Sequence, residues 1–295
     1  MAISTEMIKT LREATGAGVL DCKKALEATG GDPDRAAAYL REKGLAVAAK
    51  KSGRTANEGT VKIWVDPAGQ LGIVVEVNCE TDFVARTEDF QQFAEAMVKQ
   101  ISQDGDVSDV TGLLAQPFVG DAGQTVGERL TQLVAKLGEN IMVRRFERIQ
   151  RQGAGWIEGY THPGSRIGVI LHLSAGSAGV AAGAPFRDLA HNLALQIAAV
   201  APLYISPGDI PQAELNAKEA LYRDQLANDG KPDAIKERIV TGKLDKWYEQ
   251  VCLVRQPYIR DDAVKVGDLI GQTSRQLDTP IRVERFIRYE LGTGE

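Results

Sequence analysis

Cysteine is scarce in this sequence, and no two cysteines lie close together. The 295 residues include three, Cys22, Cys79 and Cys252, an odd number without a CxxC pair. This spacing excludes a disulfide framework and a zinc knuckle. Long apolar runs are lacking too, and the opening "MAISTEMIKTLREATG" mixes acids with bases and has no apolar signal-peptide segment. We therefore expect a cytoplasmic protein.

The sequence also lacks an excess of cations and the common nucleotide-binding and metal-binding motifs. Its formal net charge of −5 argues against broad nucleic-acid binding, which needs many cations to neutralise phosphates. It contains neither a Walker A motif nor a dinucleotide fingerprint. The three histidines, His162, His172 and His191, do not have the spacing of metal ligands. We expect no metal, no cofactor and no direct binding of nucleotide, nucleic acid or membrane.

The first 44 residues contain three helical patterns. Asp32 is placed to cap the third of them, and Pro33 stands at its first position. Gly44 is the expected end of that helix. The stretch that follows, "AVAAKKSGRTANEG", predicts a linker with a helical start.

The remainder of the chain contains a duplication. The stretches "GTVKIWVDPAGQLGIVVEVN" and "GYTHPGSRIGVILHLS" each predict a β-hairpin. Each is followed by an amphipathic helix, and each half closes with a Val-Gly-acid helix start and a strand. Gly72 aligns with Gly168 at an offset of 96, and Gly127 aligns with Gly267 at an offset of 140. The second copy therefore carries about 44 extra residues, whose two helical patterns around "NDGKPD" predict a helical hairpin.

These patterns predict an α+β protein with antiparallel sheets and covering helices. The helical hairpin is a candidate dimerisation or docking arm, because a protruding pair cannot bury both faces on its own domain. The predicted boundaries are 1–45 for the three-helix module, 46–58 for the linker, 59–150 and 151–291 for the two core subdomains, and 207–252 for the hairpin.

The stretch "NCETDFVART" leaves an apolar strand through an acid and an aromatic side by side. In one reading, Thr81 or Asp82 caps a helix and Phe83 packs onto the next turn. In the other, Phe83 is an exposed anchor for a partner protein, with Asp82 beside it as an acceptor. A catalytic thiol at Cys79 is disfavoured, because Glu80 and Asp82 would raise its pKa. The second copy has "HLSAGSAGV" at this exit, so the scaffold does not require the Asp-Phe pair.

Several motifs resemble those of bacterial elongation factor Ts, the guanine nucleotide exchange factor for elongation factor Tu. They are "LREATGAGVLDCKKALEATGGD", "EVNCETDFVAR", "LGENIMVRR" and "RIGVIL", in order over nearly the whole chain. The resemblance implies a first module similar to a ubiquitin-associated domain, two core subdomains, and a coiled-coil hairpin. It also implies that Asp82 and Phe83 enter the partner near its Mg²⁺ site and promote GDP release, without bond chemistry.

The resemblance further implies contacts with the GTPase domain of elongation factor Tu and with a further domain of that partner. The matching positions of this sequence are Arg12, Val19, Leu20, Lys51, Thr81, Asp82, Phe83, Val84, Leu137, Gly138 and His162. A homodimer or a 2:2 assembly through the core and the hairpin stays open. Some members continue into a C-terminal helix, whereas this sequence ends at "FIRYELGTGE", so contacts of that module are not expected. Two rival hypotheses are an adaptor that uses only the N-terminal helices and a cysteine-dependent enzyme.

Overall fold

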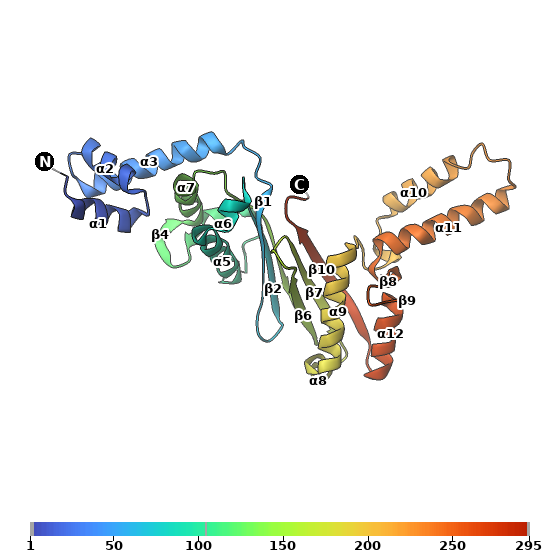
Figure 1. Ribbon diagram of the computed structural model, residues 1–295. Coiled ribbons are helices and arrows are strands. Elements are labelled where there is room, and N and C mark those ends of the chain that lie inside the picture. The colour runs from blue at the N-terminus through green and yellow to red at the C-terminus, as the bar shows by residue number, and fades with distance from the viewer. Residues whose placement is uncertain (1–2, 104, 294–295) are drawn as a thin grey trace.

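The molecule is elongated, with helices at both ends and two sheets between them (Figure 1). A computed structural model describes residues 3–103 and 105–293. The class is α+β, and every strand pair within the sheets is antiparallel. Among the described residues, no helix is both long enough and apolar enough to cross a membrane.

The N-terminal end is a cluster of three helices. Ser4 caps the first, and Asp32 caps the third by accepting a hydrogen bond from the backbone N–H of Arg35, with Pro33 at the first helical position as predicted. The three helices enclose a small apolar core around Leu26. The helices are α1 (Thr5–Thr15), α2 (Val19–Ala28) and α3 (Pro33–Lys51).

The predicted end of the third helix at Gly44 is wrong, because α3 continues for almost two further turns to Lys51. Gly44 is buried where α3 packs against α7 (Val126–Leu137), and a Cβ at this position would lie 3.6 Å from Ala135. This helix contact stabilises the helix beyond the glycine, since packing routinely outweighs a single unfavourable propensity. The first part of the predicted linker is therefore helical.

The first α+β unit has a three-stranded sheet in the order β1-β2-β5. Helices α5 and α7 cover one face of it, and their buried side chains pack with those of β2. The strands are β1 (Glu58–Val65), β2 (Leu71–Cys79) and β5 (Met142–Gln150), with a small pair, β3 (Pro117–Phe118) and β4 (Asp121–Thr125). The helices are α4 (Asp82–Ala85), α5 (Glu88–Gln103), α6 (Val110–Ala115) and α7.

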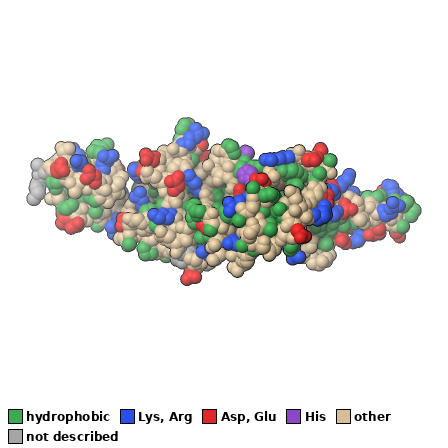
Figure 2. Space-filling view, turned by 90° about the horizontal axis from the view of Figure 1, so that it is seen from below, with side chains coloured by type: hydrophobic (Ala, Val, Ile, Leu, Met, Phe, Trp, Pro, Cys, Tyr) green, Lys and Arg blue, Asp and Glu red, His purple; other side chains and the backbone are tan. Residues whose placement is uncertain are grey.

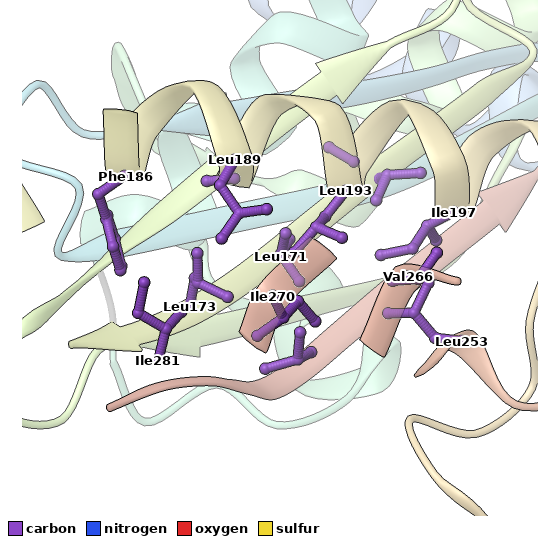
Figure 3. Close-up of a cluster of buried hydrophobic side chains, with 14 of the residues drawn as sticks. Leu171, Leu173, Phe186, Leu189, Leu193, Ile197, Leu253, Val266, Ile270 and Ile281 are labelled. Carbon is purple, nitrogen blue, oxygen red and sulfur yellow. The ribbon is translucent and has the colours of Figure 1, made fainter. Parts of the chain in front are cut away.

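The second unit repeats this plan with a sheet in the order β10-β7-β6. Its helix-side core joins leucines of β7 to Phe186 and the apolar face of α9 (Figure 3). The strands are β6 (Gly155–Thr161), β7 (Ile167–Ala175) and β10 (Ile281–Glu290), with a small pair, β8 (Pro257–Tyr258) and β9 (Asp261–Lys265). The helices are α8 (Ala178–Ala182), α9 (Ala184–Val200) and α12 (Val266–Gln276).

The two sheets pack against each other through their other faces. Their shared core includes Val61 and Val74 of the first sheet and Ile157 and Ile170 of the second. The central strands β2 and β7 are consequently buried on both faces, which is why both read as continuous apolar runs. The molecule is thus layered as helices, sheet, sheet and helices.

The extra residues of the second unit form the predicted helical hairpin at the far end of the molecule (Figure 1). Helices α10 (Gln212–Asp224) and α11 (Asp233–Val251) lie between the short 3₁₀ turns Pro207–Asp209 and Leu253–Arg255. The core of this hairpin includes Leu226, just after α10, and Val240, Leu244 and Trp247 of α11. Basic and acidic side chains are interspersed over this arm on the face shown in Figure 2.

Candidate functional site

The exit of β2 is a capped turn that presents an aromatic ring. The Thr81 hydroxyl accepts a hydrogen bond from the backbone N–H of Val84 at 3.4 Å, so Thr81 is the cap of α4. Phe83 is 79% exposed, while Ala85 of the same short helix is buried. The turn therefore has an ordinary helix cap, and its largest apolar side chain still points into solvent.

Asp82 stands beside the ring as a paired carboxylate. Its Oδ2 lies 2.7 Å from the guanidinium of Arg86, and both side chains are well exposed. Exposed ion pairs of this kind contribute little to stability. Asp82 can therefore exchange Arg86 for a group on another protein at little cost in stability.

A carboxylate from a distant part of the chain holds the backbone just before this turn. Glu139 Oε2 accepts hydrogen bonds from the backbone N–H groups of Glu80 and Thr81 at 3.1 and 3.0 Å. Its Oε1 accepts one from the Thr81 hydroxyl at 2.6 Å. The Cys79 thiol adds a contact to the Thr81 carbonyl oxygen at 3.1 Å. Bonds to an ionised acceptor are the stronger class of hydrogen bond, so this backbone segment is firmly held.

The carboxylate of Glu80 makes a second connection between the same two segments, and here the backbone of the other segment donates. Glu80 accepts a hydrogen bond from the backbone N–H of Asn140 at 2.7 Å, and this contact, with the nearby Arg54, lowers the pKa of Glu80. The amide of Asn140 donates to the carbonyl oxygen of Arg54 at 2.7 Å. Lys51 at the end of α3 donates to the carbonyl oxygen of Gly138. Three segments of the chain, the end of α3, the exit of β2 and the start of β5, therefore meet here.

The structure brings most of the predicted contact positions to this junction. Leu137 and Gly138 end α7 directly before Glu139, and Lys51 is bonded to Gly138. His162 is exposed in the β6–β7 turn, and its Nδ1 lies 3.0 Å from the Tyr160 hydroxyl. The same turn contacts the start of β1 through the ion pair between Arg166 and Glu58 at 2.5 Å and a backbone bond from Val61 to Ser165. Glu58 pairs with Cys79, so this turn and the exit of β2 lie at the same end of the sheets.

The remaining predicted positions lie apart from the junction. Arg12 is on α1, and Val19 and Leu20 begin α2, at the N-terminal end of the molecule (Figure 1). Leu20 is 73% exposed and Val19 is 53% exposed. They form a second exposed apolar spot next to Asp21, which pairs at 2.6 Å with Lys43 near the middle of α3.

The cysteines do not form a nucleophilic centre. All three are buried, and burial, with the nearby Glu139, raises the pKa of Cys79 to about 12. Burial likewise raises the pKa of Cys252 to about 11. The described residues 3–103 and 105–293 also contain no cluster of three or more side chains of the kind that holds a metal ion.

The native protein is expected to resist thiol-specific reagents at pH 8. A raised pKa keeps a thiol protonated at that pH, and the thiolate is the reactive form. Titration with a chromogenic disulfide should detect the three thiols of the sequence only after unfolding in guanidinium. Rapid labelling of Cys79 in the native protein would contradict this expectation.

The sequence interpretation missed Glu80, Glu139 and Asn140 as parts of the site. One signal was present in the duplication. At the offset of 140, Glu139 aligns with Thr279, so a charged residue in one copy stands opposite a hydroxyl in the other.

An exposed ring beside a lightly held carboxylate, on a firmly held turn, is the anatomy of a protein-binding surface. The chain agrees with the family model described as Elongation factor TS over residues 80–293. It is 42% identical over 292 residues to Elongation factor Ts of Clostridium kluyveri, covering 99% of this chain and 94% of the relative. It is 44% identical over 299 residues to Elongation factor Ts of Nostoc punctiforme, covering 99% and 93%. The chain belongs to the elongation factor Ts family of translation elongation factors.

Proposed function

We propose that this protein binds elongation factor Tu in its GDP-bound form and promotes release of the GDP. The observation that carries the proposal is the exposure of Phe83 on a turn that Glu139 and Thr81 hold in place. Membership of the elongation factor Ts family supports the choice of partner. An exposed aromatic on a held backbone loses little conformational entropy on binding, which favours it as an anchor.

In the proposed mechanism, Phe83 inserts between helices of the partner's GTPase domain and Asp82 orients it on that surface. The insertion shifts the elements that support the Mg²⁺ ion of the GTPase. That ion is held by few protein ligands, together with phosphate oxygens and water, so a small displacement weakens it. Without the ion, the phosphate charge is poorly neutralised and GDP leaves.

The energetics require tighter binding to the nucleotide-free partner than to its GDP-bound form. Moving such a balance from 1:99 to 99:1 takes about 5.5 kcal/mol of differential binding. By linkage, rebinding of GDP weakens the complex by the same amount, and GTP releases the factor through its own coupling of the same kind. The protein makes and breaks no covalent bond and uses no cofactor, so it is an exchange factor without a reaction centre.

Further contacts extend the proposed interface beyond the wedge. Arg12 on α1, with Val19 and Leu20 at the exposed start of α2, docks on the GTPase domain. A second group of residues contacts the partner around the junction, and these contacts extend to a further domain of elongation factor Tu. The group consists of Lys51, Thr81, Val84, Leu137, Gly138 and His162. His162 lies at the same end of the sheets as the wedge, so one partner face can reach both.

The proposed modules are those expected from the sequence. Residues 1–45 form a module similar to a ubiquitin-associated domain, 46–58 connect it to the core, and 59–150 and 151–291 are the core subdomains. The hairpin within 207–252 and the core are the proposed surfaces for an assembly with two copies of this chain. The proposed location is the cytoplasm, where elongation factor Tu acts.

The direct test is release of fluorescent GDP from purified elongation factor Tu, followed by stopped flow with increasing amounts of this protein. The release rate is expected to rise with concentration and to saturate. Excess unlabelled GDP should dissociate the complex in light scattering after size exclusion. A release rate that stays at the spontaneous value, with both proteins folded, would refute the proposal.

A further inference from the structure

The duplication places two equivalent turns in one molecule. At the offset of 96, Thr81 aligns with Ser177, and both side chains cap the short helix that follows their strand. Phe83 aligns with Gly179. The two turns therefore share a backbone plan, and only the first presents a ring.

The two turns are held to different extents. In the second copy, the backbone N–H of Gly176 donates to the Thr279 hydroxyl at 3.0 Å. In the first copy, the aligned Glu139 accepts three hydrogen bonds, from two backbone N–H groups and the Thr81 hydroxyl. The return contact from Glu80 to the backbone of Asn140 has no counterpart, because Pro280 aligns with Asn140 and has no N–H.

In the second copy, where the turn carries no ring, the hydroxyl of Thr279 thus makes the contact that the Glu139 carboxylate makes in the first. The carboxylate exceeds what the fold needs at that position. A carboxylate shared by two successive peptide groups and a side chain fixes the orientation of both peptides, and bonds to an ionised acceptor are about twice as strong as neutral ones. Phe83 begins only two residues after the second of these peptides, so its direction depends on them.

We propose that Glu139 is a positioning residue for Phe83, acting through the backbone of Glu80 and Thr81. This inference rests on the proposed exchange function. A side chain that inserts into a packed partner is pushed back by the groups that it displaces, so its backbone must be held in place. Glu139 supplies that support from outside the turn, and the reciprocal Glu80–Asn140 contact keeps the start of β5 in register with it.

The test compares Glu139→Thr, Glu139→Gln and Thr279→Val as full-length proteins in the GDP-release assay. Glu139→Thr copies the residue that the scaffold already accepts at the aligned position, so the fold is retained. It is expected to lower the maximal release rate about tenfold, because the hydrogen bonds from the two backbone N–H groups are lost. Glu139→Gln should recover most of the rate, because its amide oxygen can accept from both backbone N–H groups. Thr279→Val, the matched control, should change the rate less than about twofold.

A double-mutant cycle with Phe83→Ala separates positioning from general structure. If Glu139 acts through the ring, Glu139→Thr should cause no further loss in the Phe83→Ala background. A wild-type rate for Glu139→Thr beside a slow Phe83→Ala would overturn this inference and leave the exchange function standing. An equal loss from Thr279→Val, or an undiminished tenfold loss in the Phe83→Ala background, would also overturn it. A wild-type rate for Phe83→Ala would refute the wedge itself.

Discussion

Replacement of Phe83 by alanine is expected to slow the GDP release that this protein stimulates in elongation factor Tu about 30-fold, corresponding to about 2 kcal/mol for truncation of an interface anchor. The ring is largely exposed, so the free protein loses little buried area. Alanine also favours the helix in which Phe83 stands. The midpoint of thermal unfolding should therefore stay within about 2 °C of the wild type. Stopped-flow release of fluorescent GDP and circular dichroism measure the two quantities.

Leu203→Ala is the matched control for this prediction. Leu203 is another large apolar side chain, 66% exposed, in the segment that follows α9. Its truncation should leave GDP release unchanged, because it lies outside the proposed interface. Equal effects of the two substitutions would mean that exposed apolar area alone, and no specific wedge, drives the exchange.

Replacement of Gly168 by valine is expected to reduce the free energy of unfolding by about 3 kcal/mol. Gly168 lies in the central strand β7, against the other sheet. A Cβ at this position would come within 2.7 Å of Val61 Cγ1 and 2.9 Å of Ile63 Cδ1. These neighbours are β-branched and stiff, so they cannot swing away. Urea unfolding followed by circular dichroism should show a lower midpoint.

Gly242→Ala is the appropriate control for the effect of glycine itself. Gly242 is exposed within α11, and a Cβ there would have no neighbour within 4 Å. Alanine should raise the stability by about 0.5–1 kcal/mol through its helix propensity. A Gly168→Val protein as stable as the wild type would show that the two sheets can move apart without cost.

Much of this fold follows from local patterns in the sequence. Both β-hairpins, the amphipathic helices after them and the helical pair around "NDGKPD" are confirmed, because each depends on periodicity and turn residues within a short window. Gly44 was misjudged because its local signal is that of a helix end. Its neighbours Thr131 and Ala135 come from a helix almost ninety residues later, which no local pattern can reveal.

In the candidate site, too, the features with a local signal could be predicted and the long-range contacts could not. The pattern around Thr81 suggested a helix cap, and the Thr81 hydroxyl does cap α4, while the alternative in which Phe83 packs onto the next turn is wrong because the ring is exposed. Glu139 escaped notice because its hydrogen bonds reach residues 58 and 59 positions earlier in the chain. The contact roles of the other named positions stay predictions.

The continuous helix α3 fixes the distance between the exposed Leu20 and the exposed Phe83. Asp21, next to Leu20, pairs with Lys43, and the part of α3 from Lys43 to Lys51 spans about 12 Å at 1.5 Å per residue. Lys51 fastens its end to Gly138, next to the junction that holds the exit turn. A partner that engages the exposed Leu20 meets the ring of Phe83 at a set spacing, with no flexible tether to search through. The effective concentration of the second contact then depends on how well the spacing of the partner's two sites matches that distance. Lengthening α3 by one turn would change the distance and weaken the combined binding through both contacts.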